Sequence, residues 1–224
     1  MKIAIIGLGD TKEEAPIDDP EWIKYGLPWD DNFQKYDCLF EMHQPELLQL
    51  PLAGVWSEHW DGKRMVIDMH RPEDYLTRLH MIARDKKKIL YAHERFIEGI
   101  KPFPFNKIHN LLPDYYISSM SYMLALAIYT LAGEKKIDER EIGIWGVDIC
   151  VDGEWVYQRA NNEYFIGRAE GMGIKVTLPE GSMLKKFVPL PVKFGAIEIQ
   201  YNQRYGLLGP EPQEFKRCES NTIR

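Results

Sequence analysis

The chain has 224 residues, a mass of 26.2 kDa and a formal net charge of −6 at neutral pH. This length suffices for one large domain with a proper hydrophobic core. Hydrophobic residues make up 45% and charged residues 28% of the chain, which is ordinary for folded domains and excludes disorder of the whole chain. The acidic balance argues against a broad basic surface for duplex DNA.

The sequence predicts neither a secretory leader nor a membrane anchor. The chain opens on the strand-like run 2–8, and no stretch reaches the roughly 18 apolar residues of a membrane helix. Cys38, Cys150 and Cys218 lie far apart without metal-ligand spacing, which is typical of reduced thiols. We therefore expect a cytoplasmic protein that makes no contact with a membrane.

The N-terminal half begins with a β-branched run, 2–8, that is typical of a buried strand in a parallel sheet. The other elements expected in this half follow in chain order: a loop at 9–31 with a short helix near 21–24, a strand at 36–42, a short helix at 45–50, a short strand at 54–56, a helix at 72–84, a strand at 89–92 and a surface loop at 96–113. The pattern leaves 59–71 undecided.

The C-terminal half contains the clearest unit, a helix at 120–131 that is apolar on all sides and should be buried. Ser118 or Ser119 is expected to cap this helix, and Gly133 to close it. The other expected elements follow in chain order: a brief strand at 115–117, a strand at 141–147, a helix at 162–172 closed by Gly173, a strand at 174–178, a strand at 196–201 and a loose tail.

Strands that alternate with helices predict an α/β fold, a Rossmann-like three-layer sandwich with a mainly parallel sheet. We expect residues 1–186 to form a nucleotide-binding domain with a lid or insertion at 57–113, and 187–224 to form a C-terminal extension. In such folds ligands bind where the strands end. The candidate functional residues are therefore those that follow the predicted strands.

The first candidate is the loop after strand 2–8, which contains Gly7, Gly9, Asp10 and Thr11. Glycines let the backbone approach a phosphate, and exposed amides bind it. Lys12 replaces the third glycine of a dinucleotide fingerprint, so a mononucleotide or a nucleotide-sugar is favoured over NAD. The alternative interpretation is a tight turn.

The second candidate is the pair Ser118 and Ser119 at the start of the buried helix. Two hydroxyls together with the free amides of a helix start form an anion site. Plain helix capping is the alternative interpretation. A basic run at 86–88 is interpreted as a solvated helix end, with a phosphate contact as its alternative.

The third candidate combines Asp148 with a polar block before the predicted helix 162–172. Asp148 follows an apolar strand, where a carboxylate can hold a ribose or a metal or act as a general base. Gln158, Arg159 and Asn161 form a polar cluster, in which Arg159 can clamp a phosphate or a carboxylate. Glu163 is expected in the first helical turn, either complementing the helix dipole or acting as a nucleophile or base.

His43 and His93 each follow a predicted strand, so either one is a candidate general base. The alternative for each is a surface histidine or one with satisfied hydrogen bonds. The histidines form no compact His/Asp metal motif, and no metal or other cofactor is predicted. A nucleotide-sugar is expected as substrate instead.

Two segments, 117–128 (ISSMSYMLALAI) and 141–148 (EIGIWGVD), resemble the central signature of bacterial sialyltransferase-like proteins. In that signature a Thr/Ser-Ser-Gly opening precedes a buried helix, and a strand then ends in Gly-Ile/Val-Asp; in this chain Met120 replaces the glycine. The loop 7–11 is similar to the family's first nucleotide-binding loop. The resemblance implies a Rossmann-like glycosyltransferase fold that holds a donor nucleotide against Gly9, Thr11, Ser118 and Ser119.

Two further resemblances add alternatives. The block Y-Q-R-x-N-x-E at 157–163 is similar to proteins of tailed bacteriophages, which implies an infected host cell as the location. The stretch 162–176 is similar to nucleoside deoxyribosyltransferases, in which a glutamate attacks the anomeric carbon, and Glu163 would be that nucleophile.

Three functions therefore stay open. The first is glycosyl transfer from a nucleotide-sugar, with Asp148 holding the sugar or acting as base, and with Gln158, Arg159 and Asn161 positioning the donor or acceptor. The second is N-glycosyl hydrolysis or transfer through Glu163. The third is nucleotide binding without catalysis. The sequence identifies neither the sugar nor the acceptor, and modified DNA is one acceptor considered.

Overall fold

The computed structural model describes residues 1–43, 55–60, 65–70, 75–136, 139–147, 155–185, 191–194 and 197–200. The chain divides into two compact units, Met1–Leu184 and Lys185–Arg224. The first unit holds the main sheet and its helices. The second holds one antiparallel hairpin, formed by β10 (Pro191–Phe194) and β11 (Ile197–Gln200). The strand predicted at 196–201 is thus confirmed as β11.

The first unit is built on an open, seven-stranded, all-parallel sheet in the order β7-β6-β3-β2-β1-β8-β9, which confirms the α/β, Rossmann-like prediction. The chain moves outward from β1 to β7 and then returns to the other side of β1. A topological switch point therefore lies between β1 and β8. The strands are β1 (Lys2–Ile6), β2 (Trp22–Gly26), β3 (Cys38–Glu41), β6 (Ile89–Ala92), β7 (Lys101–Pro102), β8 (Glu141–Trp145) and β9 (Lys175–Thr177).

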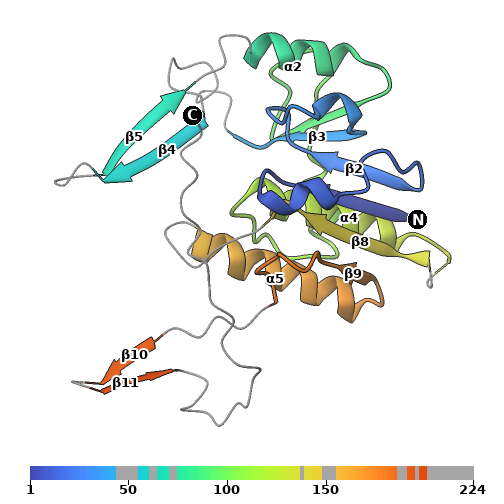
Figure 1. Ribbon diagram of the computed structural model, residues 1–224. Coiled ribbons are helices and arrows are strands. Elements are labelled where there is room, and N and C mark those ends of the chain that lie inside the picture. Colours follow the sequence, from blue (N-terminus) through green and yellow to red (C-terminus); the bar gives the residue numbers. More distant parts are fainter. Residues whose placement is uncertain are drawn as a thin grey trace. The chain divides into compact units, whose positions relative to one another are not determined.

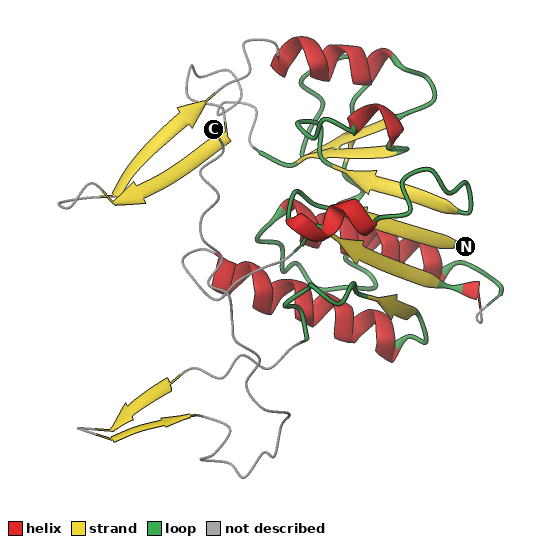
Figure 2. Ribbon diagram, in the orientation of Figure 1, coloured by secondary structure: helices red, strands yellow, loops and turns green. Residues whose placement is uncertain are grey.

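Helices cover both faces of this sheet (Figure 1 and Figure 2). The helix α2 (Tyr75–Arg84) packs on one face, and α4 (Ser119–Ala132) and α5 (Trp155–Gly171) pack on the other. The side chains of a strand point alternately to the two faces of a sheet. In β1, Ile3 and Ile5 therefore pack in the core under α4 and α5, whereas Ala4 and Ile6 pack in the core under α2. Short helices complete the unit: η1 (Asp10–Glu14), η2 (Phe33–Lys35) and α3 (Phe105–Ile108).

The helix α4 forms as its sequence predicts. Ser118 is its extended N-cap residue, and the Ser121 hydroxyl accepts the Ser118 amide at 3.2 Å and donates to the Ser118 carbonyl at 2.6 Å. Gly133 lies at the C-terminal end of the helix. Buried side chains on most sides of the helix explain why it is apolar all round.

A second hairpin within the first unit pairs β4 (Val55–Trp60) with β5 (Met65–His70), antiparallel. The strand predicted at 54–56 therefore continues to Trp60, and much of the undecided segment 59–71 is strand. The expected lid or insertion, 57–113, includes parts of this hairpin, but it also supplies α2 to one helical layer and β6 and β7 to the main sheet.

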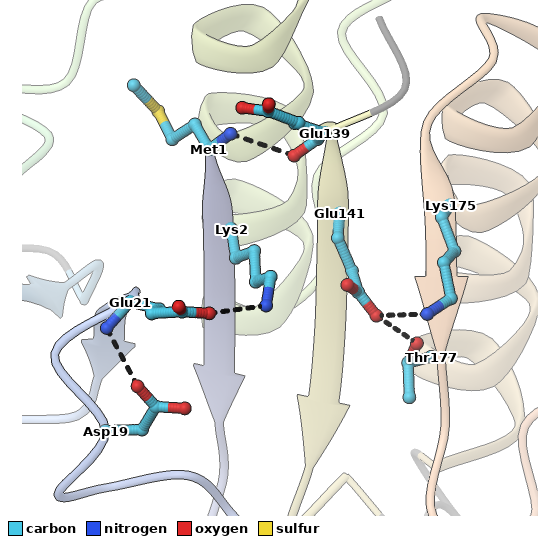
Figure 3. Close-up of polar contacts among 8 residues, drawn as sticks. All are labelled: Met1, Lys2, Asp19, Glu21, Glu139, Glu141, Lys175 and Thr177. Carbon is cyan, nitrogen blue, oxygen red and sulfur yellow. Dashed lines mark hydrogen bonds and ion pairs between the residues drawn. The ribbon is translucent and has the colours of Figure 1, made fainter. Parts of the chain in front are cut away.

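Polar contacts tie the strands together where they begin (Figure 3). Lys2 Nζ pairs with Glu21 at 2.8 Å, and Glu141 pairs with Lys175 at 2.8 Å and accepts a hydrogen bond from Thr177. Lys2, Glu141 and Lys175 open β1, β8 and β9. Glu21 precedes β2, and Thr177 is the last residue of the three-residue strand β9. Exposed ion pairs contribute little free energy each. The candidate residues that were predicted from strand ends lie at the opposite edge, where the strands end, here called the carboxyl edge.

Two predictions about irregular segments are wrong, and a third is wrong in part. The short helix near 21–24 is the strand β2, because parallel pairing with β1 draws this segment into the sheet. The segment 115–117 is not a strand in the structure: Tyr116 packs its ring against Phe165 of α5 instead. The predicted surface loop 96–113 contains β7 and α3, together with buried apolar side chains: Ile97, Ile100, Phe103, Ile108 and Leu112.

The predicted start of the last long helix is also wrong. The helix α5 begins at Trp155 rather than at residue 162, so the polar block 158–161 lies inside the helix. Glu163 accordingly lies in about the third turn, too far from the helix start to complement its dipole. Asn161 and Asn162 are fully buried there, and this packing outweighs the weak helix propensity of asparagine. The predicted end is confirmed: Gly173 has φ 73° and follows the helix.

Several predictions lie outside the described residues: the helix at 45–50, Asp148, Cys150, Cys218 and the terminal tail. Cys38 is buried and unpaired with another cysteine. A search of the described helices found none with the length and apolarity needed to cross a membrane.

Candidate functional site at the carboxyl edge

The loops after β1 and β8 are joined directly to each other at the topological switch point. The Gly7 amide donates to the Trp145 carbonyl, and the Gly9 amide donates to the Gly146 carbonyl, each at 2.8 Å. In return, the Gly146 amide donates to the Thr11 hydroxyl at 2.8 Å. The Gly7 and Gly9 amides, expected to hold phosphate, are therefore engaged in contacts within the protein.

Close approach of the two backbones explains the glycines in these loops. A Cβ atom on Gly7 would lie 2.2 Å from the Gly146 carbonyl oxygen. Gly146 has a φ of +65°, and a Cβ there would lie 2.6 Å from the Gly7 carbonyl oxygen. Two residues nearby differ in exposure: Asp10 is exposed, whereas Thr11 is buried. This geometry fits the tight-turn interpretation.

A carboxylate–imidazole pair lies at the end of β3. Glu41 is fully buried, and its Oε1 lies 2.5 Å from His43 Nδ1 and accepts the His43 backbone amide at 3.0 Å. The Tyr75 hydroxyl of α2 donates to the other carboxylate oxygen. The Trp29 ring lies 5.4 Å from the imidazole, centre to centre. The His43 side chain stays 42% exposed, so it is accessible and firmly oriented at the same time.

The electrostatics of this pair suit a general base. The hydrogen bond that His43 Nδ1 donates to the Glu41 carboxylate raises the pKa of His43 above its usual value of 6.5, against the opposing effect of burial. With Nδ1 held by the carboxylate, the neutral imidazole carries its proton on Nδ1 and its lone pair on Nε2. No described residue forms a hydrogen bond to Nε2. The pair is therefore arranged to take a proton from a bound ligand.

His93 follows β6, the neighbouring strand, but it faces the other side of the sheet. Its ring stacks on Phe105, and its Nε2 lies 3.3 Å from the Tyr122 hydroxyl of α4. His43, by contrast, lies on the face covered by α2, where it and Tyr75 both contact the Glu41 carboxylate. The two candidate histidines thus occupy one edge of the sheet, and the structure does not bring them together.

The start of α4 lies against α5. Asn161 of α5 donates from Nδ2 to the Tyr115 carbonyl at 2.6 Å, three residues before the N-cap Ser118. The structure therefore brings Asn161 close to the segment that enters α4 and carries Ser118 and Ser119. Half-buried Gln158 lies on the same helix, one turn earlier.

Arg159 and Glu163, expected in separate roles, form an ion pair on α5. Arg159 Nε lies 2.9 Å from Glu163 Oε1, four residues on. The guanidinium expected to clamp a phosphate thus contacts a carboxylate of its own helix. The carboxylate expected to act as nucleophile is held by the same contact.

Sequence reasoning identified His43 but missed its partners. Residues two apart in a strand point to the same face, so the spacing Glu41–His43 was the available signal. Tyr75 and Trp29 carry no such signal, because they come from other elements. Among the described residues, no group of three or more His, Cys, Asp or Glu could hold a metal ion.

Comparisons of the chain with models of protein families, with curated proteins and with solved structures each gave no match. The function proposed below therefore depends on the geometry of the carboxyl edge.

Proposed function

We propose that the protein is a glycosyl-transfer enzyme that binds a nucleotide-sugar at the carboxyl edge and uses His43 as its general base. The observation that supports this most strongly is the 2.5 Å contact between Glu41 and the half-exposed imidazole of His43. Open parallel sheets bind ligands at this edge, and nucleotides are common among those ligands. A buried carboxylate behind an accessible imidazole is the arrangement that a base needs.

The reaction assigns a role to each atom of the pair. His43 Nε2 takes the proton of the acceptor hydroxyl as its oxygen forms a bond to the anomeric carbon of the sugar. The bond from that carbon to the phosphate oxygen breaks, and the nucleotide leaves with the electron pair. Glu41 stabilises the imidazolium that forms. A positioned base of this kind contributes about 10²–10⁴-fold to the rate.

The start of α4 supports an anionic leaving group. Its first amides have no partner within the helix, and the helix dipole places partial positive charge there. Ser119 stands at this start and adds a hydroxyl donor, whereas Ser118 is the N-cap residue and its hydroxyl oxygen is buried. Preorganised donors of this kind stabilise charge that develops on a leaving phosphate. Trp29, beside His43, offers an apolar face on which a sugar ring can pack.

The test is release of free nucleotide from a panel of nucleotide-sugars, with water as the acceptor. We expect His43→Gln to lower the rate by about 10²–10⁴-fold. The matched control is His80→Gln, because His80 is an exposed histidine on α2, and it should retain the wild-type rate. A folded His43→Gln protein with the wild-type rate would exclude His43 as the base.

A further inference from the structure

We propose that Arg78 binds an anionic group of the acceptor, a phosphate or a carboxylate, beside the base His43. The inference rests on the proposed function and names the chemical class of the acceptor. In that function His43 takes the proton of the acceptor hydroxyl, so the groups around His43 contact the acceptor. Arg78 belongs to α2, the helix that also supplies Tyr75 to the Glu41 carboxylate.

The loop after β2 connects Arg78 with the base. Arg78 Nη1 donates to the Pro28 carbonyl at 3.3 Å. The next residue, Trp29, packs its ring 5.4 Å from the His43 imidazole and 6.0 Å from the ring of Tyr75. Tyr75 and Arg78 are three residues apart on α2, which places them on one side of the helix. The guanidinium and the imidazole therefore contact adjacent residues of one loop.

The positive charge of Arg78 has no counter-ion in the part of the chain that the structure describes. No carboxylate there lies within ion-pair distance of the guanidinium, and the buried acid of the same loop, Asp30, has Lys12 as its cation at 3.7 Å. Arg78 is half-buried, and charged side chains that lose contact with water are usually paired. An anionic ligand would supply the counter-ion.

Two contacts hold the guanidinium in place and leave most of its donors available. A guanidinium has five N–H donors in one plane, and the Pro28 carbonyl accepts from one of them. The Phe33 ring packs against the guanidinium, with Cζ 4.8 Å from the ring centre. Pairs of N–H groups in such a plane bind the oxygens of a phosphate or a carboxylate in a bidentate manner. Arg78 is therefore oriented before an oxyanion binds.

The first experiment is NMR titration of the full chain with inorganic phosphate and with acetate, which carry the two anionic groups without a sugar. The guanidinium resonance of Arg78 and the imidazole resonances of His43 report binding. We expect at least one anion to shift both signals. Arg78→Gln should weaken the affinity measured at His43 about tenfold or more, because hydrogen bonds between charged groups are lost.

Two further variants control for charge and for position. Arg84→Gln is the matched control, because Arg84 is an exposed arginine of the same helix, and it should bind the anion like wild type. Arg78→Lys keeps the charge without the planar fork, so its affinity should lie between those of wild type and Arg78→Gln.

The second experiment tests whether the anion belongs to the acceptor. Nucleotide release from a nucleotide-sugar is measured with glycerol 3-phosphate, glycerate and glycerol as acceptors. We expect wild type to have a lower KM for at least one of the two acids than for glycerol, and the acid with the lower KM identifies the anionic group. Arg78→Gln should raise the KM for that acid about tenfold and leave the KM for glycerol unchanged.

The outcomes separate this inference from the proposed function. Absence of shifts with both anions in wild type, or equal anion affinities in wild type and Arg78→Gln, would overturn the inference with the proposed function intact. Equal KM values for the three acceptors in wild type would overturn it too. Anion binding at Arg78 in a protein that releases no nucleotide would contradict the proposed function and support the anion site alone.

Discussion

Glu41 and His43 stand two residues apart at the end of β3, on one face of the strand, and meet at 2.5 Å between Oε1 and Nδ1. The contact follows from the period of two in a strand, because alternate side chains point the same way. The hydroxyl of Tyr75 holds the second oxygen of Glu41, so α2 fixes the carboxylate from the adjoining layer. Helix, strand and imidazole are thus joined by hydrogen bonds at the carboxyl edge.

The pH dependence of turnover should report this pair. Because the Glu41 hydrogen bond raises the pKa of His43, the base becomes available only above a pKa higher than 6.5. In Glu41→Gln the acid limb of the kcat/KM profile should move to lower pH, since the hydrogen bond to the carboxylate is lost and burial still lowers the pKa. Profiles of both proteins measure this. An acid limb at the same pH in both would contradict it.

The same pair should make stability depend on pH. The pKa of His43 is higher in the folded than in the unfolded chain, so the fold favours the protonated imidazole. The resulting stabilisation is fully present below the unfolded pKa of about 6.5, and it is lost as the pH rises through the folded pKa. Urea denaturation of wild type and His43→Gln should therefore differ more at about pH 5.5 than at about pH 8.5. An equal difference in the free energy of unfolding at the two pH values would contradict this coupling between the His43 pKa and stability.

The glycine contact between the β1 and β8 loops should not tolerate a methyl group. In Gly7→Ala the new Cβ would lie 2.2 Å from the Gly146 carbonyl oxygen, a backbone atom that cannot rotate away. We expect a loss of about 1–3 kcal/mol in the free energy of unfolding. Gly167→Ala is the matched control, because nothing lies within 4 Å of that position in α5. It should gain up to about 1 kcal/mol from helix propensity.

Denaturant titration measures both glycine variants. If Gly7→Ala is as stable as wild type, the two loops do not approach each other as described. If Gly167→Ala is the less stable of the two variants, Gly167 does not lie at an uncrowded position of the helix α5.

The ion pair on α5 tests the alternative in which Glu163 is the nucleophile. The pair with Arg159 spans four residues of one helix at 2.9 Å, and such pairs contribute about 0.3–0.5 kcal/mol. We therefore expect Glu163→Gln to lose little stability and to keep turnover within a few-fold of wild type. Intact-mass measurement after incubation with nucleosides and nucleotide-sugars should show no sugar attached to the protein. A covalent adduct on Glu163 would favour N-glycosyl chemistry instead.

Much of the fold could be predicted because its central elements are locally unambiguous. The β-branched sequence of β1 favours a strand and the apolar sequence of α4 favours a helix, and both elements are buried as expected. The strand β2 was missed because its sequence, WIKYG, has no apolar alternation, and it becomes a strand through pairing with β1. The early start of α5 was missed because buried asparagines look like a loop until their packing is known.

The site was less predictable than the fold. Strand ends drew attention to His43, Thr11 and Ser118, all of which lie at the carboxyl edge. Their partners come from other elements, as when Tyr75 of α2 reaches Glu41. Sequence alone also favoured phosphate binding by the Gly7 and Gly9 amides, whereas backbone pairing across β1 and β8 uses both groups. Contacts of this kind depend on which strands become neighbours.

The most direct test of the central proposal is nucleotide release by wild type, His43→Gln and His80→Gln, measured side by side on one panel of nucleotide-sugars. We predict release by wild type and His80→Gln, and a loss of about 10²–10⁴-fold in His43→Gln, with circular dichroism spectra that are the same for all three. Equal release by the three folded proteins would show that the Glu41–His43 pair is not the base. Absence of release from every nucleotide-sugar by wild type would contradict glycosyl transfer itself.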